Sequence, residues 1–376
     1  MDQRQRIVII DDNANDLAVT RRLLERRGYD VLAAPSGEEG LRIAGEVVPD
    51  AIVVDYRMPG MDGFEVTRRV KADPQLKTIP VLMLTGADTA QNVVEGLGVG
   101  ADDFVVKGSD IEVIVARLRA LLRVKAYQDQ LRRMNAQIMR DLQIARRVQE
   151  ALVPQGIFRG PRVEVRSAYI PSEALSGDFY DYFLLDEFMY LFVADVSGHG
   201  LHAAILVSLL KSYIHTEADP DSSLADFMSR LNNFLFAVSL PTQFATAQLF
   251  RIDQQGVLLY SNAAHPSFLL YQREQGKTLL LEEPSNLLGA MPNMGFEERK
   301  LTMAPGDMLF AYTDGLTDRR DATGEFYSID RVSALLEDAR DADLGTIYDS
   351  IFADVSNFPA TDEFKDDIAF VVTRFH

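Results

Sequence analysis

Hydrophobic and polar positions in the first 125 residues alternate between short β-branched runs and longer amphipathic stretches. Apolar runs such as "RIVIID", "AIVVD" and "IPVLML" have the length and composition of buried strands. The stretches between them, such as "NDLAVTRRLLERRG" and "ADTAQNVVEGLGVG", place apolar residues at helical spacing. Five strand–helix pairs in succession predict a doubly wound α/β domain with a parallel sheet over residues 1–123.

A single long helical repeat follows this domain. Its apolar residues recur at steps of three and four, about 3.5 on average, which is typical of a coiled-coil seam. We predict a helical coiled-coil linker over residues 124–153 that pairs two copies in parallel, and Pro154 ends it. The alternative is one long helix that packs on its own domain and exposes an arginine-rich face. The apolar positions are Leu118, Leu121, Val124, Tyr127, Leu131, Met134, Ile138, Leu142, Ala145, Val148 and Leu152.

Over residues 154–376 the predicted strands and helices come in blocks. Runs such as "FMYLFVADVSG", "ATAQLFRI", "DMLFAYTDG" and "DIAFVVTRF" predict strands. This order predicts an α+β domain, a β-sandwich of antiparallel sheets flanked by helices. The helical patterns lie near residues 199–217, 221–239, 328–338 and 343–357.

Composition narrows the chemistry that the chain can perform. It has no cysteine, which excludes thiolate catalysis, cysteine-bound zinc and disulfides. It has only five histidines, which disfavours a histidine-rich metal site. A net charge of −18 argues against nucleic acid as a partner, because binding to phosphate backbones relies on Lys and Arg. No apolar run reaches the ~20 residues of a membrane span, and no signal peptide is recognisable. We therefore expect a cytoplasmic protein with no membrane contact.

Polar residues follow the predicted strands of the first domain. In a parallel sheet these positions share one edge, where ligands bind. Carboxylates gathered there with one lysine and one hydroxyl favour a bound Mg²⁺, although any single strand-end acid could instead cap the next helix. The residues are Asp11, Asp12, Asp55, Thr85 and Lys107.

The motifs "IIDD", "VVDYRMPGMDG", "LTG" and "FVVK", in this order over residues 5–123, resemble the receiver domain of two-component response regulators. The resemblance implies a flavodoxin-like fold in which Asp55 accepts a phosphoryl group from a histidine kinase or phosphotransfer protein. The implied Mg²⁺ ligands are Asp11, Asp12, Asp55 and the backbone of Arg57. The implied switch residues are Thr85, Phe104 and Lys107. One residue departs from the family: Gly108 follows the lysine where proline is usual, so the next loop lacks its usual restraint.

A second set of acids lies at the edges of apolar runs in the last 220 residues. The motifs are "SGDFYD" with Asp178, "VADVSGHG" with Asp195, "AYTDGLTD" with Asp314, and "KDDIAFVV" with Asp366 and Asp367. Carboxylates without cysteine describe an all-oxygen site for Mg²⁺ or Mn²⁺. Two such ions can share a water, lower its pKa and stabilise phosphoryl oxygens during in-line attack. We interpret Tyr180 and Asp181 of the first motif as packing and turn residues.

These motifs in order over residues 155–376 resemble the PPM (PP2C-type) serine/threonine phosphatases of the SpoIIE and RsbU branch, and "LQIARRVQEALVP" resembles the linker that precedes them. The resemblance implies two Mn²⁺ or Mg²⁺ ions, with Asp195 bridging them and Asp367 supporting the ligands. The implied ligands are Asp178, Asp195, the Val196 carbonyl, Asp314 and Asp366. His199 either protonates the leaving oxygen or lines the cleft at a helix start. We expect His265 in "SNAAHPSFLL" to be structural.

Together these features predict a response regulator in which phosphorylation of Asp55 controls a metal-dependent protein serine/threonine phosphatase, paired as a homodimer through its linker helix. The family implies a phosphoserine or phosphothreonine protein as substrate, such as a STAS anti-sigma-factor antagonist. The alternative is a non-catalytic adaptor that binds a regulatory partner under control of the receiver. Four acidic ligand positions favour catalysis. A DNA-binding regulator is disfavoured, because no basic recognition module follows the receiver.

Overall fold

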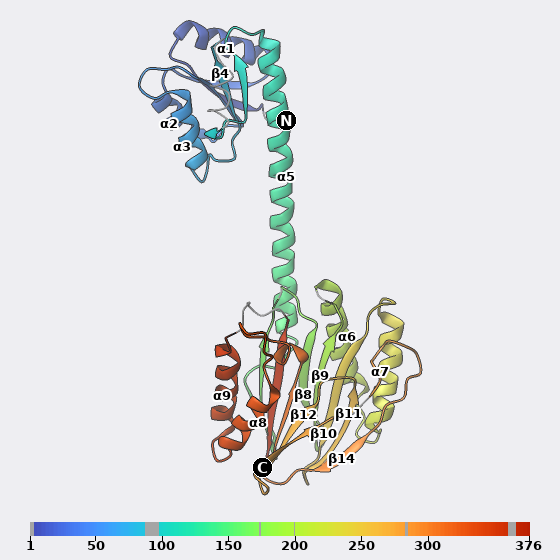
Figure 1. Ribbon diagram of the computed structural model, residues 1–376. Coiled ribbons are helices and arrows are strands. Elements are labelled where there is room, and N and C mark those ends of the chain that lie inside the picture. Colours follow the sequence, from blue (N-terminus) through green and yellow to red (C-terminus); the bar gives the residue numbers. More distant parts are fainter. Residues whose placement is uncertain (1–3, 87–97, 173, 199, 283–284, 360–365) are drawn as a thin grey trace. The chain divides into compact units, whose positions relative to one another are not determined.

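The computed structural model describes residues 4–86, 98–172, 174–198, 200–282, 285–359 and 366–376. The chain forms two compact units, Met1–Ile138 and Met139–His376 (Figure 1). Two of the predictions above, most of the helix in "ADTAQNVVEGLGVG" and the role of His199, fall outside the described residues.

The first unit is built on a parallel five-stranded sheet with the order β2-β1-β3-β4-β5. This confirms the predicted doubly wound α/β fold, in which strand order reverses between β1 and β3 and their carboxyl ends lie side by side. The strands are β1 (Arg6–Ile10), β2 (Asp30–Ala34), β3 (Ala51–Asp55), β4 (Val81–Thr85) and β5 (Asp103–Val106). Helices α1 (Ala14–Arg26), α2 (Gly37–Val47) and α3 (Gly63–Ala72) lie between them.

Helix α5 (Ile111–Glu150) is one continuous element of 40 residues. Its first turns are buried, because Ile114, Val115 and Leu118 pack on the parallel sheet of the first unit. Further along, the predicted seam is exposed, with Tyr127 at 66% and Leu131 at 59%. The helical linker is confirmed, and the alternative in which this stripe packs on its own domain is wrong for these residues. Among the described helices, none combines the length and the apolar character needed to span a lipid bilayer.

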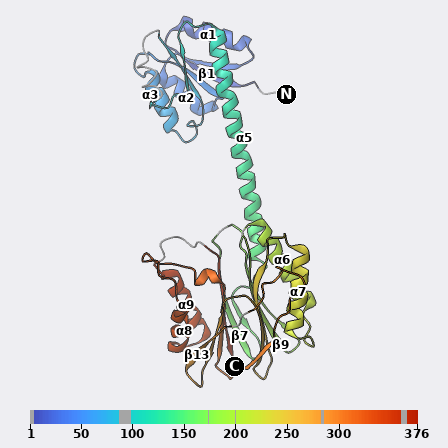
Figure 2. The same cartoon turned by 45° about the vertical axis from the view of Figure 1, so that its right-hand side comes forward.

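The second unit is a sandwich of two antiparallel sheets with helices on both outer faces (Figures 1 and 2), which confirms the predicted α+β architecture. One sheet has the order β14-β11-β10-β9-β8 and carries α6 (Leu201–Glu217) and α7 (Leu224–Val238). The other has the order β13-β12-β15-β16-β7-β6 and carries α8 (Ile329–Asp338) and α9 (Leu344–Asn357). The strands are β6 (Ile157–Arg159), β7 (Val163–Ile170), β8 (Asp178–Leu185), β9 (Phe188–Val196), β10 (Ala245–Ile252), β11 (Val257–Ala263), β12 (Phe268–Gln272), β13 (Lys277–Leu281), β14 (Arg299–Thr302), β15 (Met308–Tyr312) and β16 (Ile368–Phe375).

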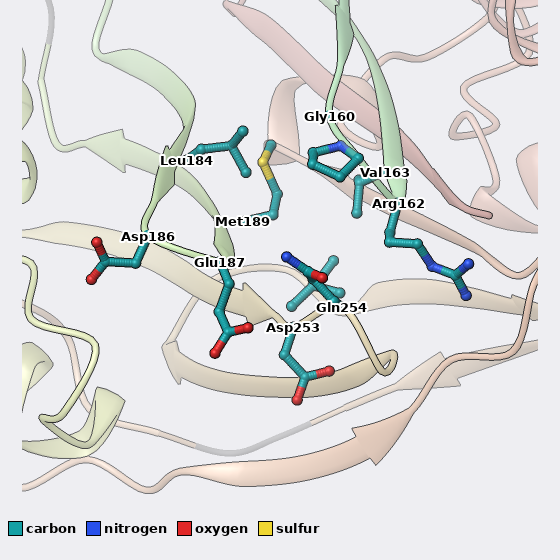
Figure 3. Close-up of a pocket in the computed structure, with 11 residues that line it drawn as sticks. Gly160, Arg162, Val163, Leu184, Asp186, Glu187, Met189, Asp253 and Gln254 are labelled. Atoms are coloured by element: carbon teal, nitrogen blue, oxygen red, sulfur yellow. The ribbon is translucent and has the colours of Figure 1, made fainter.

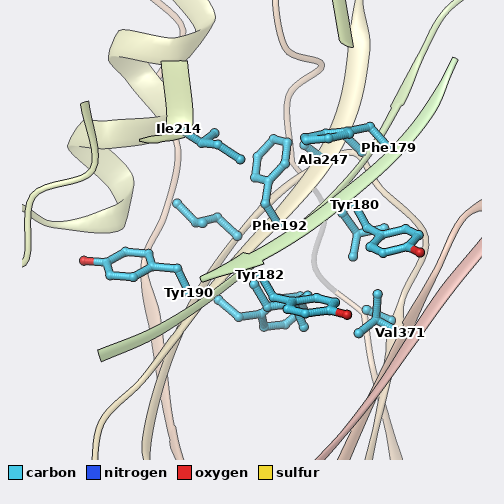
Figure 4. Packing of buried hydrophobic residues seen from close by; sticks show 14 of the residues in the cluster. Phe179, Tyr180, Tyr182, Tyr190, Phe192, Ile214, Ala247 and Val371 are labelled. Atoms are coloured by element: carbon cyan, nitrogen blue, oxygen red, sulfur yellow. The ribbon is translucent and has the colours of Figure 1, made fainter. Parts of the chain in front are cut away.

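Strand β8 divides its side chains between two parts of the core. Tyr180 and Tyr182 face the opposite sheet, where Val371 lies, whereas Phe179 lies on the other face of the strand, the face that α6 covers (Figure 4). Alternation of this kind follows from the period of two along a strand. It places Asp178 on the same face as Tyr180, toward the space between the sheets.

The interpretation of Asp181 as a turn residue was wrong. Asp181 lies within β8 and is buried on the face toward α6, where its Oδ2 is 2.8 Å from Nζ of Lys211 and 2.7 Å from Nε2 of His215. Its other oxygen accepts the backbone N–H of Tyr182. A buried carboxylate needs such partners, and here the partners attach α6 to the strand that begins with Asp178.

Candidate functional site

The receiver acids converge because their strands are neighbours in the sheet. Asp11 and Asp12 follow β1, and Asp55 is the last residue of β3. Each of the three offers a carboxylate oxygen within 4.8 Å of the others. The arrangement fits one hard divalent ion such as Mg²⁺, which prefers a few carboxylates and retains water in its remaining positions.

Lys107, directly beyond β5, reaches into this acidic cluster. Its Nζ lies 2.9 Å from Oδ2 of both Asp11 and Asp55, and 3.2 Å from Asp16. Burial raises the pKa of Asp55, and the charges of Asp11 and Asp12 add to this effect, together outweighing Lys107. Burial alone would lower the pKa of Lys107, but hydrogen bonds to Asp55 and Asp11 raise it, so the ammonium stays charged.

The remaining receiver residues lie around the same edge. Thr85 is buried at the end of β4, next to β3, and its carbonyl accepts the backbone N–H of Lys107 at 2.5 Å. Phe104 is half-buried in β5 and packs against the core. Arg57 is exposed in the loop two residues beyond Asp55. The structure therefore brings Thr85 and Lys107 to the strand ends that hold the acids.

In the second unit, Asp178 and Asp195 are directly opposite each other in the β8–β9 pair. Residues opposite each other in an antiparallel pair point to the same face, so both carboxylates face the space between the sheets. The backbone N–H of Val196 donates to the carbonyl of Gly177 at 3.1 Å. A Cβ atom on Gly177 would lie only 2.4 Å from the Val196 carbonyl oxygen and 3.2 Å from an oxygen of Asp195. A residue with a side chain at this position would therefore collide with the Val196 carbonyl.

The opposite sheet supplies the other two acids. Asp314 follows β15 and Asp366 precedes β16, two strands that pair with each other. A Cβ atom on Gly315 would lie 1.9 Å from the carbonyl oxygen of Asp367, so a glycine is required for these two loops to pack together. Burial raises the pKa of Asp195 to about 7, and the charges of Asp314 and Asp366 contribute. The four acids thus gather at one end of the sandwich.

The carboxylate oxygens of this second cluster are spaced more widely than those of the first. In the part of the chain that the structure describes, only the receiver trio places three carboxylate oxygens within 4.8 Å of one another. Asp178 is 3% exposed, and its pKa is well above the usual range because of burial and the charge of Asp195. Asp178 and Asp195 are desolvated and repel each other beside the Val196 carbonyl, which fits a hard divalent cation that would favour their ionised forms. Asp314 and Asp366 are exposed.

Two further residues hold Asp178 and the residue before it, Gly177. Thr313 is fully buried, and its hydroxyl donates to Oδ2 of Asp178 at 2.5 Å while accepting the backbone N–H of Ala369 at 2.9 Å. Asp367 accepts the N–H of Ser172 at 2.7 Å and the N–H of Gly177 at 3.2 Å, one on each carboxylate oxygen. These contacts favour the supporting role that the sequence predicts for Asp367.

His265 contacts the strand next to the one that carries Asp195. Its Nδ1 is 2.7 Å from the hydroxyl of Thr246, the residue that pairs with Asp195 across β10 and β9. Burial lowers the pKa of His265 to about 3, so the ring is neutral. A neutral buried ring with a hydroxyl partner favours the structural role expected for this histidine.

Sequence reasoning missed Thr313, Gln149 and Ser176. Thr313 stands directly before Asp314 and has the appearance of an ordinary β-branched strand residue, so only its place before a candidate ligand could have identified it. Gln149 lies in a polar stretch of helix that is typical of a solvated face, yet it is buried. Nothing in the pattern indicates that its amide bonds to Ser176.

A small hollow lies at the opposite ends of β8 and β9 (Figure 3). It includes Asp186 and Glu187 of the β8–β9 turn and Asp253 of the β10–β11 turn, and its volume is about 30 Å³. This is room for a few water molecules only. The hollow is therefore separate from the acids at the start of β8 and the end of β9.

Comparison with known proteins covers both units. The family model described as "Response regulator receiver domain" matches residues 7–119, and the model described as "Stage II sporulation protein E (SpoIIE)" matches residues 186–376, just over half of the chain. The DNA-binding dual master transcriptional regulator RpaA of Synechocystis sp. is 42% identical over 118 residues, 31% of this chain and 49% of that protein. Protein IcfG of Synechocystis sp. is 28% identical over 303 residues, 69% of this chain and 45% of that protein.

Among solved structures, the SiaA-PP2C domain of Pseudomonas aeruginosa matches with a TM-score of 0.55 and 20% identity, over 65% of this chain and 99% of that one. This likeness concerns the fold. The chain spans about half or less of the length of these curated relatives. Since the SpoIIE model covers more than half of the residues, the chain belongs to the SpoIIE family, with a response regulator receiver domain ahead of its PP2C-like domain.

Proposed function

We propose that this chain is a response regulator whose output is a metal-dependent phosphoprotein phosphatase of the PPM type. The observation that carries the proposal is the register that sets Asp178 opposite Asp195, while Asp314 and Asp366 approach from the facing sheet. Two Mn²⁺ or Mg²⁺ ions bound there would supply a water of lowered pKa and would stabilise the phosphoryl oxygens during in-line attack.

The chain's own residues hold and orient this site. Asp195 and the Val196 carbonyl lie at the end of β9, and Asp314 and Asp366 complete the acidic set. Thr313 occupies Oδ2 of Asp178, which leaves Oδ1 available to a cation. No side-chain nucleophile is needed. His199 remains our candidate for protonating the leaving oxygen, with a place lining the cleft as the alternative.

In the receiver we propose that Asp55 accepts a phosphoryl group from a histidine kinase or phosphotransfer protein, with Mg²⁺ held by Asp11, Asp12 and the Arg57 carbonyl. Phosphorylation adds about one to two negative charges and three acceptor oxygens. These oxygens would compete for Lys107, which now bonds Asp55 and Asp11. The loop beyond the lysine leads within four residues to the start of α5, so a shift of that loop acts directly on the helix.

We further propose a division into a receiver (1–123), a linker (124–153) and a phosphatase domain (154–376), with two chains paired in parallel through the linker. The exposed apolar stripe of α5 supports the pairing, because such a stripe on a helix is the seam that a second copy would cover. Family membership supports a phosphoserine or phosphothreonine protein of the STAS type as substrate.

Turnover of an aryl phosphate and of a phosphoserine peptide by the full chain with Mn²⁺ tests the activity. We expect Asp195→Asn to lower turnover by about 100-fold or more, because it removes a charge from the centre of the site. Asp186→Asn is the matched control: Asp186 lies in the turn at the far end of β8, at a φ of +52° that asparagine tolerates well. Absence of hydrolysis in the wild-type chain, with or without receiver phosphorylation, would instead favour the adaptor.

A further inference from the structure

The last turn of α5 reaches the acidic site of the second unit through one buried side chain. Gln149 is 4% exposed, although its neighbour Val148 is 58% exposed. The amide of Gln149 bonds both backbone groups of Ser176: Oε1 accepts the N–H at 3.1 Å, and Nε2 donates to the carbonyl at 2.6 Å. The side chain therefore pairs with Ser176 much as a neighbouring strand would.

Ser176 passes this restraint to Asp178. Its hydroxyl is fully buried and accepts the backbone N–H of Asp178 at 3.0 Å. The carboxylate of Asp178 is in turn fixed at Oδ2 by Thr313. Two consecutive hydrogen-bonded contacts thus connect the amide of Gln149 with the backbone of the residue that begins β8.

Asp367 also holds this segment, by hydrogen bonds from a different part of the chain. Asp367 accepts the backbone N–H groups of Ser172 and Gly177, which lie on the two sides of Ser176 in the chain. Asp367 lies directly before β16, a strand of the sandwich. Gln149 lies on α5, so the placement of Ser176 depends on the helix as well as on the sandwich.

We propose that Gln149 is a positioning residue for Asp178, and that the metal affinity of the site depends on where the last turn of α5 holds Ser176. The inference rests on the proposed function only in taking Asp178 as a metal ligand. Replacing a residue that orients a metal ligand typically changes metal affinity or activity by about 10- to 100-fold.

Calorimetric titration of the full chain with Mn²⁺ tests the proposal. Asp12→Asn is included in every sample, because it removes one of the three carboxylates of the receiver cluster and so weakens Mn²⁺ binding there. Gln149→Met keeps the length and volume of the side chain but removes both hydrogen bonds. The matched control is Gln155→Met, the same substitution at an exposed glutamine just beyond the helix. The Mn²⁺ concentration for half-maximal turnover and the maximal turnover are measured on the same proteins.

We expect Gln149→Met to weaken Mn²⁺ binding by about 10- to 100-fold and to raise the half-maximal Mn²⁺ concentration, while turnover at saturating Mn²⁺ changes much less. Gln155→Met should bind Mn²⁺ as the Asp12→Asn parent does. Unchanged affinity in Gln149→Met, equal weakening in both variants, or parental affinity in Asp178→Asn would each overturn the proposal. Mn²⁺ binding is measured without turnover. A chain that binds Mn²⁺ but hydrolyses no substrate would therefore contradict the phosphatase proposal, and the affinity of Gln149→Met would still test the positioning role of Gln149.

Discussion

Two glycines decide how closely the acidic residues of the second unit approach one another. Gly177 lies against the Val196 carbonyl, and Gly315 lies against the Asp367 carbonyl, each at a distance that no Cβ atom could occupy. The acids themselves supply charge, but these contacts set the spacing of the strands and loops that carry them. At the residue scale, the site therefore depends on close backbone packing as much as on carboxylates.

Gly177→Ala should lower phosphatase turnover by about 100-fold, because a misplacement of about 1 Å at a reacting centre has an effect of that size. The added Cβ would push either β8 or the Val196 carbonyl away from Asp195. Turnover with Mn²⁺ is the measurement, and Gly295→Ala, where an added Cβ meets nothing within 4 Å, is the control. A variant at position 177 with wild-type turnover would contradict this account of the spacing.

Thr313→Val removes a hydroxyl that both donates to Asp178 and accepts from Ala369. We expect the second unit to lose about 1–3 kcal/mol of unfolding free energy, because the N–H of Ala369 is left buried without an acceptor. Turnover should also fall, since Oδ2 of Asp178 is released. Thr313→Ser keeps the hydroxyl and should retain most of both properties. Urea unfolding and turnover are the measurements, and equal behaviour of the two variants would argue against a hydrogen-bonding role.

His265 makes stability depend on pH in a defined direction. Burial lowers its folded-state pKa from 6.5 to about 3, so below pH 6.5 the unfolded chain takes up a proton that the folded chain does not. This contribution to stability is intact above that pH and is lost as the pH falls, by up to about 1.4 kcal/mol per pH unit. Between about pH 7.5 and about pH 5, the wild type should lose about 2 kcal/mol more than His265→Asn in urea unfolding. Identical losses would show that the ring is not held neutral.

The acids of both sites could be predicted from the sequence, because each follows or precedes an apolar run and carries a recognisable motif. The residues that hold them could not. The hydroxyl of Thr313 bonds to Asp178, 135 residues away, and the backbone of Ser176 bonds to the amide of Gln149, 27 residues away. Single-residue patterns carry no information about such partners. Asp181 was misread for a related reason, since its partners Lys211 and His215 lie on a helix 30 and 34 residues away.

At the scale of elements, strands with a simple apolar pattern were predictable, whereas β8, which holds two buried carboxylates, was not. The strands around Asp195 and Asp314 are uniform apolar runs, and the structure has them as β9 and β15. β8 begins with one buried carboxylate and contains another, so it lacks the alternation that identifies a strand. α5 was recognised from its repeat over Leu118 to Leu152, and the structure has it as one helix, Ile111–Glu150.

The exposed seam of α5 leads to a prediction about assembly. Leu131→Glu places a charge at a seam position and should convert the dimer to a monomer, because the charge would be buried in the paired helices. Ala136→Glu, on the outward face of the same helix, adds the same charge and should leave the dimer intact. Light scattering on the full chain gives the mass of each. A wild-type monomer, or a Leu131→Glu dimer, would contradict pairing through this helix.

Gly108 shows how one residue changes a connection between elements. It has a φ of +89°, a conformation that proline, the usual residue of the family at this position, cannot adopt. Gly108→Pro should therefore destabilise the receiver by about 1–3 kcal/mol, although it restores the family's residue. Thermal unfolding of the full chain is the measurement. A receiver that becomes more stable would mean that the loop adopts the family's conformation after all.

At the scale of the whole molecule, we propose that α5 connects the cluster around Asp55, which would accept the phosphoryl group, with the carboxylate site at Asp195. Lys107 lies four residues before the start of α5, and Gln149 lies in its last turn. The measurement that tests this most directly is turnover of the full chain at saturating Mn²⁺, with and without beryllofluoride as a phosphoryl mimic, in the wild type and in Asp55→Asn. The account predicts that beryllofluoride changes wild-type turnover by about 5-fold or more and leaves Asp55→Asn unaffected. Equal wild-type turnover in the two states, or the same response in both proteins, would contradict it.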